Sequence, residues 1–328
     1  LFAFVMLPAE SQLSNEAKYW IAFNDKKHNQ YSLEQPGEFL SPRSLSRREK
    51  HGIAVNVSDL PVSSYYLDSL KAMGWEILYA SKWLNGATAI PDTISLVNQT
   101  TQLSFVHEIQ KIFPGKTKKS TIDKYQTDFS SVEISNNDST YYGLSYPQIS
   151  LVEGNMIHKM GYKGKSMLIA LLDGGFEGVQ HLPVFDSLRN QNRLPYARDF
   201  VNPEASFPGG HTHGMMVLSI MGGNIPGIYT GTAPDASYAI IRTENGNSEY
   251  IIEEYNWVAG AEYADSIGAD VINSSLGYYR FDDSTQNHSY LDMNGGKTIV
   301  TKGADMGARK GIRVVDSAGN EGNDPWNY

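Results

Sequence analysis

An unbroken apolar run, Met167 to Leu172 (MLIALL), ends directly at Asp173 and two glycines. A strand that is apolar at every position is expected to be buried on both faces, as in a parallel sheet covered by helices. Further apolar strands alternate with helical stretches along the chain, at 237–242, 251–267, 271–274, 301–310 and 312–316. The region 141–328 is therefore predicted to form an α/β domain with a doubly wound, mostly parallel sheet.

The preceding region has a different pattern. Residues 18–110 predict strands at 19–23, 75–80, 83–90 and 103–109, and helices at 41–50, 67–73 and 92–97. This order fits a small α+β domain of ferredoxin-like type, in which two helices cover a four-stranded sheet. Residues 111–140 are rich in Lys, Ser, Thr and Asn. They predict an exposed connector between two domains, of the kind that proteases cut.

The composition excludes several classes of function. The 36 Asp and Glu outnumber the 27 Lys and Arg, which gives a net charge of −9. A surface that binds phosphate backbones is net basic, so nucleic acid is not expected as a partner. The chain has no cysteine, which rules out disulfides, thiol nucleophiles and Cys-type zinc sites. No apolar run reaches the roughly 18 residues that span a bilayer, so no membrane span is expected.

The N-terminal residues indicate a targeting segment. Residues 1–11 begin with an apolar run and close with Ala-Glu-Ser, which is typical of the end of a secretory signal peptide cleaved between Ser11 and Gln12. The alternative is a buried strand of the first domain. The charged start of a signal is missing, so we expect the true N-terminus to precede Leu1. On this interpretation the protein is secreted, periplasmic or held at the cell surface.

Polar residues lie where the chemistry of such a sheet is expected. The carboxyl ends of parallel strands gather at one edge, and Asp173 and Asn320 each follow a predicted strand. His213 is expected in the first turn of a helix that Thr212 caps. Taken singly, the Asp and the Asn also fit ordinary turn residues. A metal site at His211 and His213 is disfavoured, because residues two apart face different sides of a helix.

Taken in chain order, these segments carry a family resemblance. LIALLDGGF, HTHGMMVLSIMGG and VVDSAGNEGN resemble the Asp, His and oxyanion-Asn blocks of the subtilisin-like serine peptidases. GTAPDA, at 231–236, is similar to the family's turn before a central strand. DVINSSLG, at 270–277, is similar to the strand whose end lines the S1 pocket. The region 18–110 resembles the family's propeptide, which helps folding and then inhibits.

The resemblance implies a serine endopeptidase that is made as a secreted zymogen. On it, Asp173 orients His213, His213 acts as general base, and Asn320 donates a hydrogen bond to the oxyanion. The substrate backbone would bind along three residues, Ser275, Leu276 and Gly277. The partners implied are protein or peptide substrates and the chain's own propeptide. No cofactor is required.

The chain departs from the family pattern in three places. Met215 and Met216 stand where the family usually has a Thr and a second His. The nucleophile block Gly-Thr-Ser-Met-Ala is absent, so we expect the serine beyond Tyr328 and no peptidase activity from these 328 residues alone. The insertion 278–298 carries acidic residues that could bind Ca²⁺, the alternative being a solvated acidic loop; they are Asp282, Asp283 and Asp292.

A second class of function stays open on the sequence. The chain could be a non-catalytic peptidase-like binding protein or a propeptide-type peptidase inhibitor, because the nucleophile is missing. The presence of Asp173, His213 and Asn320 together argues against loss of activity. For an enzyme, we expect cleavage in the connector between about 110 and 142. Substrate preference is not predicted, because part of the pocket lies downstream.

Overall fold

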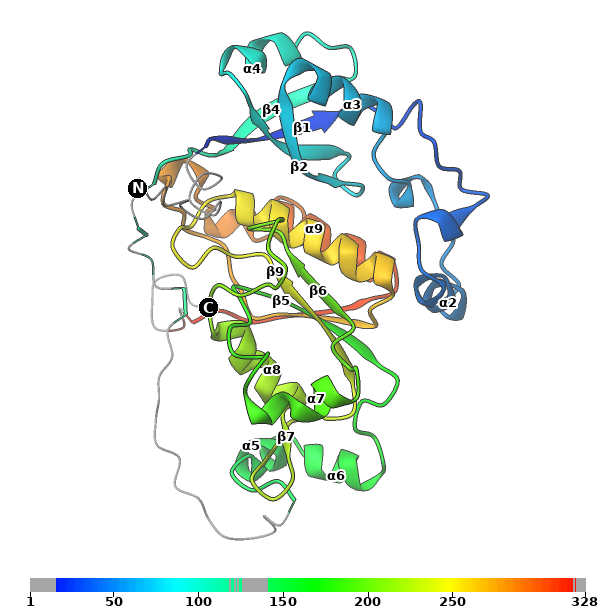
Figure 1. The fold of residues 1–328 in the computed structure, drawn as a ribbon, viewed down its shortest axis with the longest axis vertical. Helices are drawn as coiled ribbons and strands as arrows, with labels where there is room; N and C mark the ends of the chain where they lie inside the picture. The colour runs from blue at the N-terminus through cyan, green and yellow to red at the C-terminus, as the bar shows by residue number, and fades with distance from the viewer. Residues whose placement is uncertain are drawn as a thin grey trace, which may run out of the picture.

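The computed structural model describes residues 16–117, 119–120, 122, 124–125, 141–320 and 322. Within this part of the chain, two α/β regions lie on opposite sides of helix α9 (Ile252–Ile267), which runs between their sheets (Figure 1). The expected signal peptide and residues 126–140 of the expected connector lie outside the described residues. No helix of the described residues combines the length and the apolar character needed to cross a membrane.

The first region forms a four-stranded antiparallel sheet. In chain order its elements are β1 (Lys18–Phe23), α2 (Pro42–Lys50), α3 (Ser64–Met73), β2 (Trp75–Ser81), β3 (Gly86–Pro91), α4 (Ser95–Thr100) and β4 (Val106–Phe113). The strand order β2-β3-β1-β4, with antiparallel neighbours, is that of the predicted ferredoxin-like sheet. Several boundaries differ from the prediction: β3 begins at residue 86 rather than 83, α4 spans residues 95–100 rather than 92–97, and β4 spans residues 106–113 rather than 103–109.

Alternate residues of β1 face two different cores. Tyr19, Ile21 and Phe23 pack with the helices α3 and α4. Trp20 and Ala22 point to the other face, and they pack in a core that includes α9. The first sheet is therefore covered on both faces, and β1 is buried along nearly its whole length.

Helix α2 packs on α9 rather than on the first sheet. Ser41 caps it by accepting the backbone N–H of Ser44 at 3.2 Å, as the Ser-Pro start predicts. Its Arg47 and Arg48 are buried and pair with Asp265 of α9. The two helices that cover the first sheet are thus α3 and α4, and ion pairs hold α2 to the second region.

The second region forms a five-stranded parallel sheet in the order β11-β10-β5-β9-β6. Its strands are β5 (Leu168–Asp173), β6 (Tyr196–Asp199), β9 (Ser237–Arg242), β10 (Val271–Ser274) and β11 (Arg313–Asp316). The prediction of a doubly wound parallel sheet is confirmed. The edge strand β6 was not predicted, because its sequence, YARD, is too short and polar to show strand periodicity.

Helices pack on both faces of this sheet: α7 (Asp186–Asn190) and α8 (His213–Gly222) on one, α9 and α10 (Ile299–Arg309) on the other. The apolar run of β5 divides between these two cores, as burial on both faces requires. The remaining elements are short: α5 (Tyr146–Leu151), α6 (Gly154–Lys159), β7 (Asn224–Ile225), β8 (Tyr229–Thr230), and the 3-10 turns η1 (Pro36–Glu38), η2 (Val57–Asp59), η3 (Pro183–Phe185), η4 (Ser284–Gln286) and η5 (Tyr290–Asp292).

Helix α9 is buried on both sides, although it carries several polar residues. Glu262 accepts the Ser81 hydroxyl and the backbone N–H groups of Lys82, at 2.7 Å, and Trp83, at 3.1 Å. Burial raises the pKa of Glu262, and these donors act in the opposite direction. The turn after β2 therefore fixes the first region to the second through one carboxylate.

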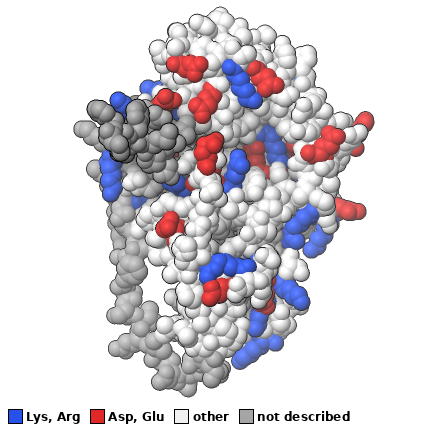
Figure 2. Space-filling view, in the orientation of Figure 1, with Lys and Arg blue, Asp and Glu red and all other residues white. Residues whose placement is uncertain are grey.

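Acidic and basic side chains are interspersed on the face shown in Figure 2. The chain as a whole carries 36 acidic and 27 basic residues. A surface that binds nucleic acid gathers its Lys and Arg into one patch or stripe. The face shown has no such gathering.

Candidate active site

Asp173 and His213 meet at the carboxyl edge of the parallel sheet. Asp173 is the last residue of β5, His213 is the first of α8, and the distance from His213 Nδ1 to Asp173 Oδ1 is 2.8 Å. The same oxygen accepts the backbone N–H of Gly174 at 2.7 Å. An ionised carboxylate only accepts hydrogen bonds, so His213 donates through Nδ1 and keeps Nε2 as a proton acceptor. A general base requires this orientation.

Local backbone geometry fixes this pair. A Cβ at position 214 would lie 2.9 Å from the Cβ of Asp173, so the close approach of α8 to β5 requires Gly214. Thr212 occupies the N-cap position of α8, as predicted, but its side chain makes no capping hydrogen bond. His211 takes that role, because its Nδ1 accepts the backbone N–H of His213 at 3.1 Å.

The two side chains differ in their access to solvent. Asp173 exposes 1% of its side chain and His213 exposes 18%. Burial raises the pKa of Asp173 above its ordinary value, and the hydrogen bond from His213 acts in the opposite direction. The second oxygen, Oδ2, is buried without a hydrogen-bond partner within the described residues. The charged form of Asp173 therefore depends on the donors at Oδ1.

The other predicted site residues follow strands of the same sheet. The predicted substrate-binding residues come directly after β10; they are Ser275, Leu276 and Gly277. The Leu276 carbonyl accepts the Ser317 hydroxyl at 3.2 Å. Gly277 is exposed, and a Cβ there would meet no heavy atom of the described residues within 4 Å, whereas Ser275 and Leu276 are half-buried. Asn320 lies four residues beyond β11 and is exposed. The parallel sheet thus brings all of them to its carboxyl edge, and Asp173 and His213 are in direct contact.

A residue of the connector covers the Asp–His pair. The ring of Tyr125 stacks on His211, with centroids 4.2 Å apart and planes inclined by 18°, and its centroid lies 4.8 Å from that of His213. A Cβ at Gly174 would lie 1.7 Å from the Tyr125 hydroxyl, so only a glycine allows this arrangement. The chain's own connector therefore occupies the space over His213.

The burial of Lys124, which precedes Tyr125, contradicts the prediction that the connector is exposed. Its ammonium lies 2.8 Å from Glu249 and 3.4 Å from Glu244, and it also pairs with Glu253. Only 9% of the Lys124 side chain is exposed. Polar composition does not distinguish a solvated lysine from one that is buried against carboxylates, which is why the prediction is wrong at this residue.

The acidic residues predicted as calcium ligands have separate neighbours. Asp282 accepts the backbone N–H of Glu249 at 2.9 Å, and Asp283 caps the turn η4. Asp292 pairs with Lys297 in another turn. Calcium binding at these residues stays a prediction. Among the described residues, three carboxylates approach within 4.8 Å of one another elsewhere, at Glu244, Glu249 and Glu253.

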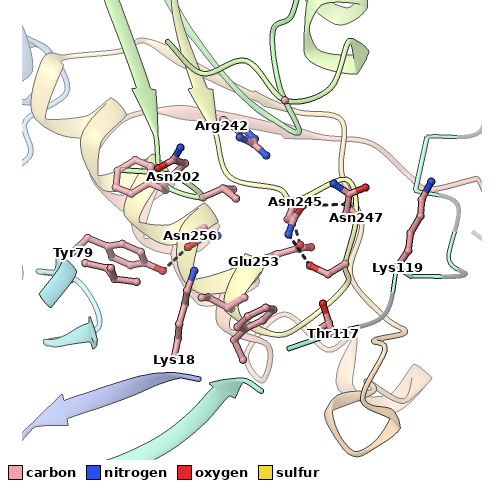
Figure 3. Close-up of a pocket in the computed structure, with 17 residues that line it drawn as sticks. Lys18, Tyr79, Thr117, Lys119, Asn202, Arg242, Asn245, Asn247, Glu253 and Asn256 are labelled. Carbon is pink, nitrogen blue, oxygen red and sulfur yellow. Dashed lines mark hydrogen bonds between the residues drawn. The ribbon is translucent and has the colours of Figure 1, made fainter. Parts of the chain in front are cut away.

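A cavity of about 650 Å³ lies beside this site, between the two regions. Figure 3 shows Lys18 and Tyr79 of the first region and Arg242, Asn245 and Asn256 of the second around it. The Tyr79 hydroxyl donates to the side-chain oxygen of Asn256 at 2.6 Å across the boundary. Because both regions line the cavity, it exists only while they are in contact.

Sequence reasoning did not identify the three glutamates as site residues. Glu253 lies in the first turn of α9, where acidic residues are common because they complement the helix dipole. Its presence there carries no functional signal. The burial of the group depends on the connector, which is distant in sequence, so no local pattern could have revealed it.

Two solved structures share this fold. Fervidolysin from Fervidobacterium pennivorans, a keratinolytic enzyme related to subtilisin, aligns with a TM-score of 0.51 at 14% identity, over 94% of this chain and 40% of its own. The epidermin leader peptide processing serine protease from Staphylococcus aureus aligns with a TM-score of 0.52 at 16% identity, over 94% of this chain and 62% of its own. The fold is therefore that of the subtilisin-like peptidases with a preceding domain.

The chain belongs to the subtilase family, because the family model matches residues 164–328. A model of the peptidase S8 propeptide domain of Bacteroidota matches residues 18–127. Subtilisin E from Bacillus subtilis (strain 168) is 29% identical over 186 residues, which are 55% of this chain and 42% of subtilisin E. The chain thus spans about two fifths of the length of this relative. The first region is accordingly called the propeptide domain below, and the second the peptidase domain.

Proposed function

We propose that the complete protein is a secreted serine endopeptidase, made as a zymogen whose propeptide domain is released by cleavage in the connector. The hydrogen-bonded Asp173–His213 pair, covered by Tyr125, carries this proposal. Polypeptide that lies over such a pair keeps substrate away from it, so the uncut protein would be inactive. Secretion rests on the apolar and small-residue pattern of residues 1–11.

The proposed mechanism assigns a role to each residue. His213, held by Asp173 through Nδ1, takes the proton of the nucleophilic serine at Nε2 and later gives it to the leaving amine. The serine oxygen bonds to the substrate carbonyl carbon, and Asn320 donates a hydrogen bond to the resulting oxyanion. The nucleophilic serine is expected beyond Tyr328. The substrate backbone pairs with the segment Ser275, Leu276 and Gly277.

The test uses the protein produced from its complete coding sequence and a fluorophosphonate probe that labels activated serines. We expect labelling after the connector is cut. His213→Ala should abolish labelling and reduce turnover by roughly 10⁶-fold, as in the corresponding subtilisin variant. Asn320→Ala should cost roughly 10²–10³ in turnover with little change in KM, because this donor meets charge only in the transition state. Labelling that survives His213→Ala would contradict the proposal.

Processing and secretion have their own measurements. N-terminal sequencing of the mature protein should find a start between about 110 and 142. A start within the propeptide domain would refute this position for the cut. Activity recovered from the medium or the cell envelope would support secretion, and activity confined to the cytoplasm would contradict it.

A further inference from the structure

Three glutamates of the peptidase domain form a buried acidic group beside His213. Glu244 lies two residues beyond β9, Glu253 lies in the first turn of α9, and Glu249 lies in the loop between them. Their carboxylate oxygens lie within 4.8 Å of one another, and none of the three residues is more than 4% exposed. We call this group the glutamate pocket.

The cation in the glutamate pocket comes from the connector. Within the described residues, Lys124 forms its ion pairs. Neutral donors of the described residues add three hydrogen bonds: the Tyr278 hydroxyl and, at 3.4 Å, the Thr243 hydroxyl donate to Glu244, and the backbone N–H of Asn245 donates to Glu253 at 3.2 Å. One ammonium group therefore serves three carboxylates.

The glutamate pocket is short of positive charge. Burial raises the pKa of Glu249 to about 7, even though Lys124 acts in the opposite direction. Arg242, at the end of β9, pairs with Asp199 at 3.1 Å rather than with the pocket. Removing the connector would leave three carboxylates together on one domain, and buried carboxylates are costly without a cation.

The connector lies in the site as a bound peptide would. The backbone N–H of Ser120 donates to the carbonyl of Asn247 at 2.9 Å, in the loop that carries the glutamates. Lys124 fills the pocket, and the next residue, Tyr125, lies over His213. A lysine and an aromatic residue thus take neighbouring positions beside the Asp–His pair.

We propose that the glutamate pocket is a substrate subsite that selects a lysine side chain, and that Lys124 occupies it as a substrate lysine does. This inference deepens the proposed function and rests on it. A lysine ammonium is compact and has three donors, which suits carboxylates converging from separate segments, whereas an arginine presents a flat fork suited to one carboxylate. The preferred peptide carries lysine directly before an aromatic residue, as Lys124 precedes Tyr125.

The test measures peptide binding to the complete protein. His213→Ala prevents cleavage, and Lys124→Ala with Tyr125→Ala empties the site of its own connector. The probe is a fluorescein-labelled peptide that copies residues 119–127, compared with the same peptide carrying norleucine in place of the lysine. Fluorescence anisotropy should give a Kd about 10- to 100-fold lower for the lysine peptide, because norleucine leaves the buried carboxylates unpaired.

Variants of the glutamate pocket test whether its carboxylates cause the preference for the lysine peptide. Glu249→Gln with Glu253→Gln should reduce the difference between the peptides to about threefold or less. Glu204→Gln, which neutralises an exposed glutamate outside the pocket, should leave the preference unchanged. Equal binding of the two peptides to the protein with the intact pocket would overturn the proposal, whether or not the pocket variants fold. Loss of the preference in millimolar Ca²⁺ or Mn²⁺ would also overturn it, in favour of a metal site.

Cleavage assays separate this inference from the proposed function. An active protein that cuts the lysine and norleucine peptides with equal kcat/KM would overturn the subsite and leave the peptidase proposal intact. Lysine-selective binding without cleavage or fluorophosphonate labelling would support the subsite and overturn the catalytic proposal. A higher kcat/KM for the lysine peptide, lost in the pocket variants, would support both.

Discussion

Two buried ionic clusters lie between the propeptide and peptidase domains, and they divide their charges differently. The glutamate pocket keeps all its carboxylates on the peptidase domain and takes its cation from the connector. In the second, which we call the Asp265 cluster, each domain contributes both a cation and a carboxylate. Its members are Arg47, Arg48, Asp59 and Lys82 of the propeptide domain and Asp265 and Lys310 of the peptidase domain.

The carboxylates of the two clusters have pKa values shifted in opposite directions. Burial acts to raise the pKa of Asp265, but hydrogen bonds and charges from Arg48, Lys82 and Arg47 outweigh it, and the pKa is lowered. In the glutamate pocket burial prevails, and the pKa of Glu249 is raised to about 7. The Asp265 cluster is therefore a paired domain contact, whereas the pocket holds more carboxylates than cations and is suited to exchanging one cation for another.

The largest effect is expected from Asp265→Asn. This change leaves two buried arginines and a lysine without their shared carboxylate, and it should lower the free energy of unfolding by about 3–5 kcal/mol. Urea unfolding followed by circular dichroism, in the His213→Ala background, measures it. The control is Asp305→Asn, which breaks an exposed pair with Arg309 and should cost less than about 0.5 kcal/mol. If Asp265→Asn and Asp305→Asn lower the free energy of unfolding equally, the Asp265 cluster does not differ from an exposed ion pair, and this would contradict the prediction.

Lys124→Met should have a smaller effect that depends on pH. It removes the cation of the glutamate pocket and should cost about 2–3 kcal/mol at pH 8. The cost should be smaller at pH 6, because carboxylates with a raised pKa take up protons when their cation is lost. The cost of Asp265→Asn should be the same at both pH values. Urea midpoints at pH 6 and 8 decide this, and a pH-independent loss for Lys124→Met would contradict the assignment.

A third prediction concerns the pH dependence of stability. The pKa of Glu249 rises from an ordinary value of 4.5 to about 7 on folding, so between these values the folded state holds a proton that the unfolded state has released. The free energy of unfolding must therefore fall as pH rises through this window, by at most about 1.4 kcal/mol per pH unit for one group. The charged groups facing Glu249, among the described residues, are Lys124, Glu244, Glu253 and Asp282. Glu249→Gln should reduce this fall in Tm measurements from pH 4.5 to 7, and an unchanged slope would count against the raised pKa.

The smallest effect is expected on the surface. Lys71 and Asp68 form an exposed pair at 3.2 Å on α3. Lys71→Ala should change the free energy of unfolding by less than about 0.5 kcal/mol, because solvent screens such pairs. The same urea assay measures this change. If Lys71→Ala lowered the free energy of unfolding as much as Lys124→Met does, burial of an ion pair would not determine how much its loss costs.

The sequence predicted those features that depend on local pattern. The strands β5 and β9 are apolar over most of their length, and β10 and β11 each carry two adjacent β-branched apolar residues, so these four strands could be recognised without their partners. The meeting of Asp173 and His213 followed from the order of the motif blocks and from the parallel sheet, which brings strand ends to one edge.

Features that depend on distant segments were not predicted. The burial of Lys124 requires Glu244 and Glu253, which lie more than a hundred residues further along the chain. The basic residues of α2 look like a solvated face until Asp265 is placed against them. Polar residues carry no periodic signal of burial, because their environment is set by the partner they meet rather than by their own pattern.

The two-sided burial of β1 has an optical consequence. Within the described residues, Trp20, Trp83 and Trp257 belong to the core that the propeptide sheet shares with α9 and α10, whereas Trp75 lies in the separate core inside the propeptide domain. Indole emission moves to longer wavelength when the ring becomes solvated. Separation of the domains would therefore shift the fluorescence of Trp20 and Trp83 and leave that of Trp75 in place, so activation could be followed in real time without an added dye.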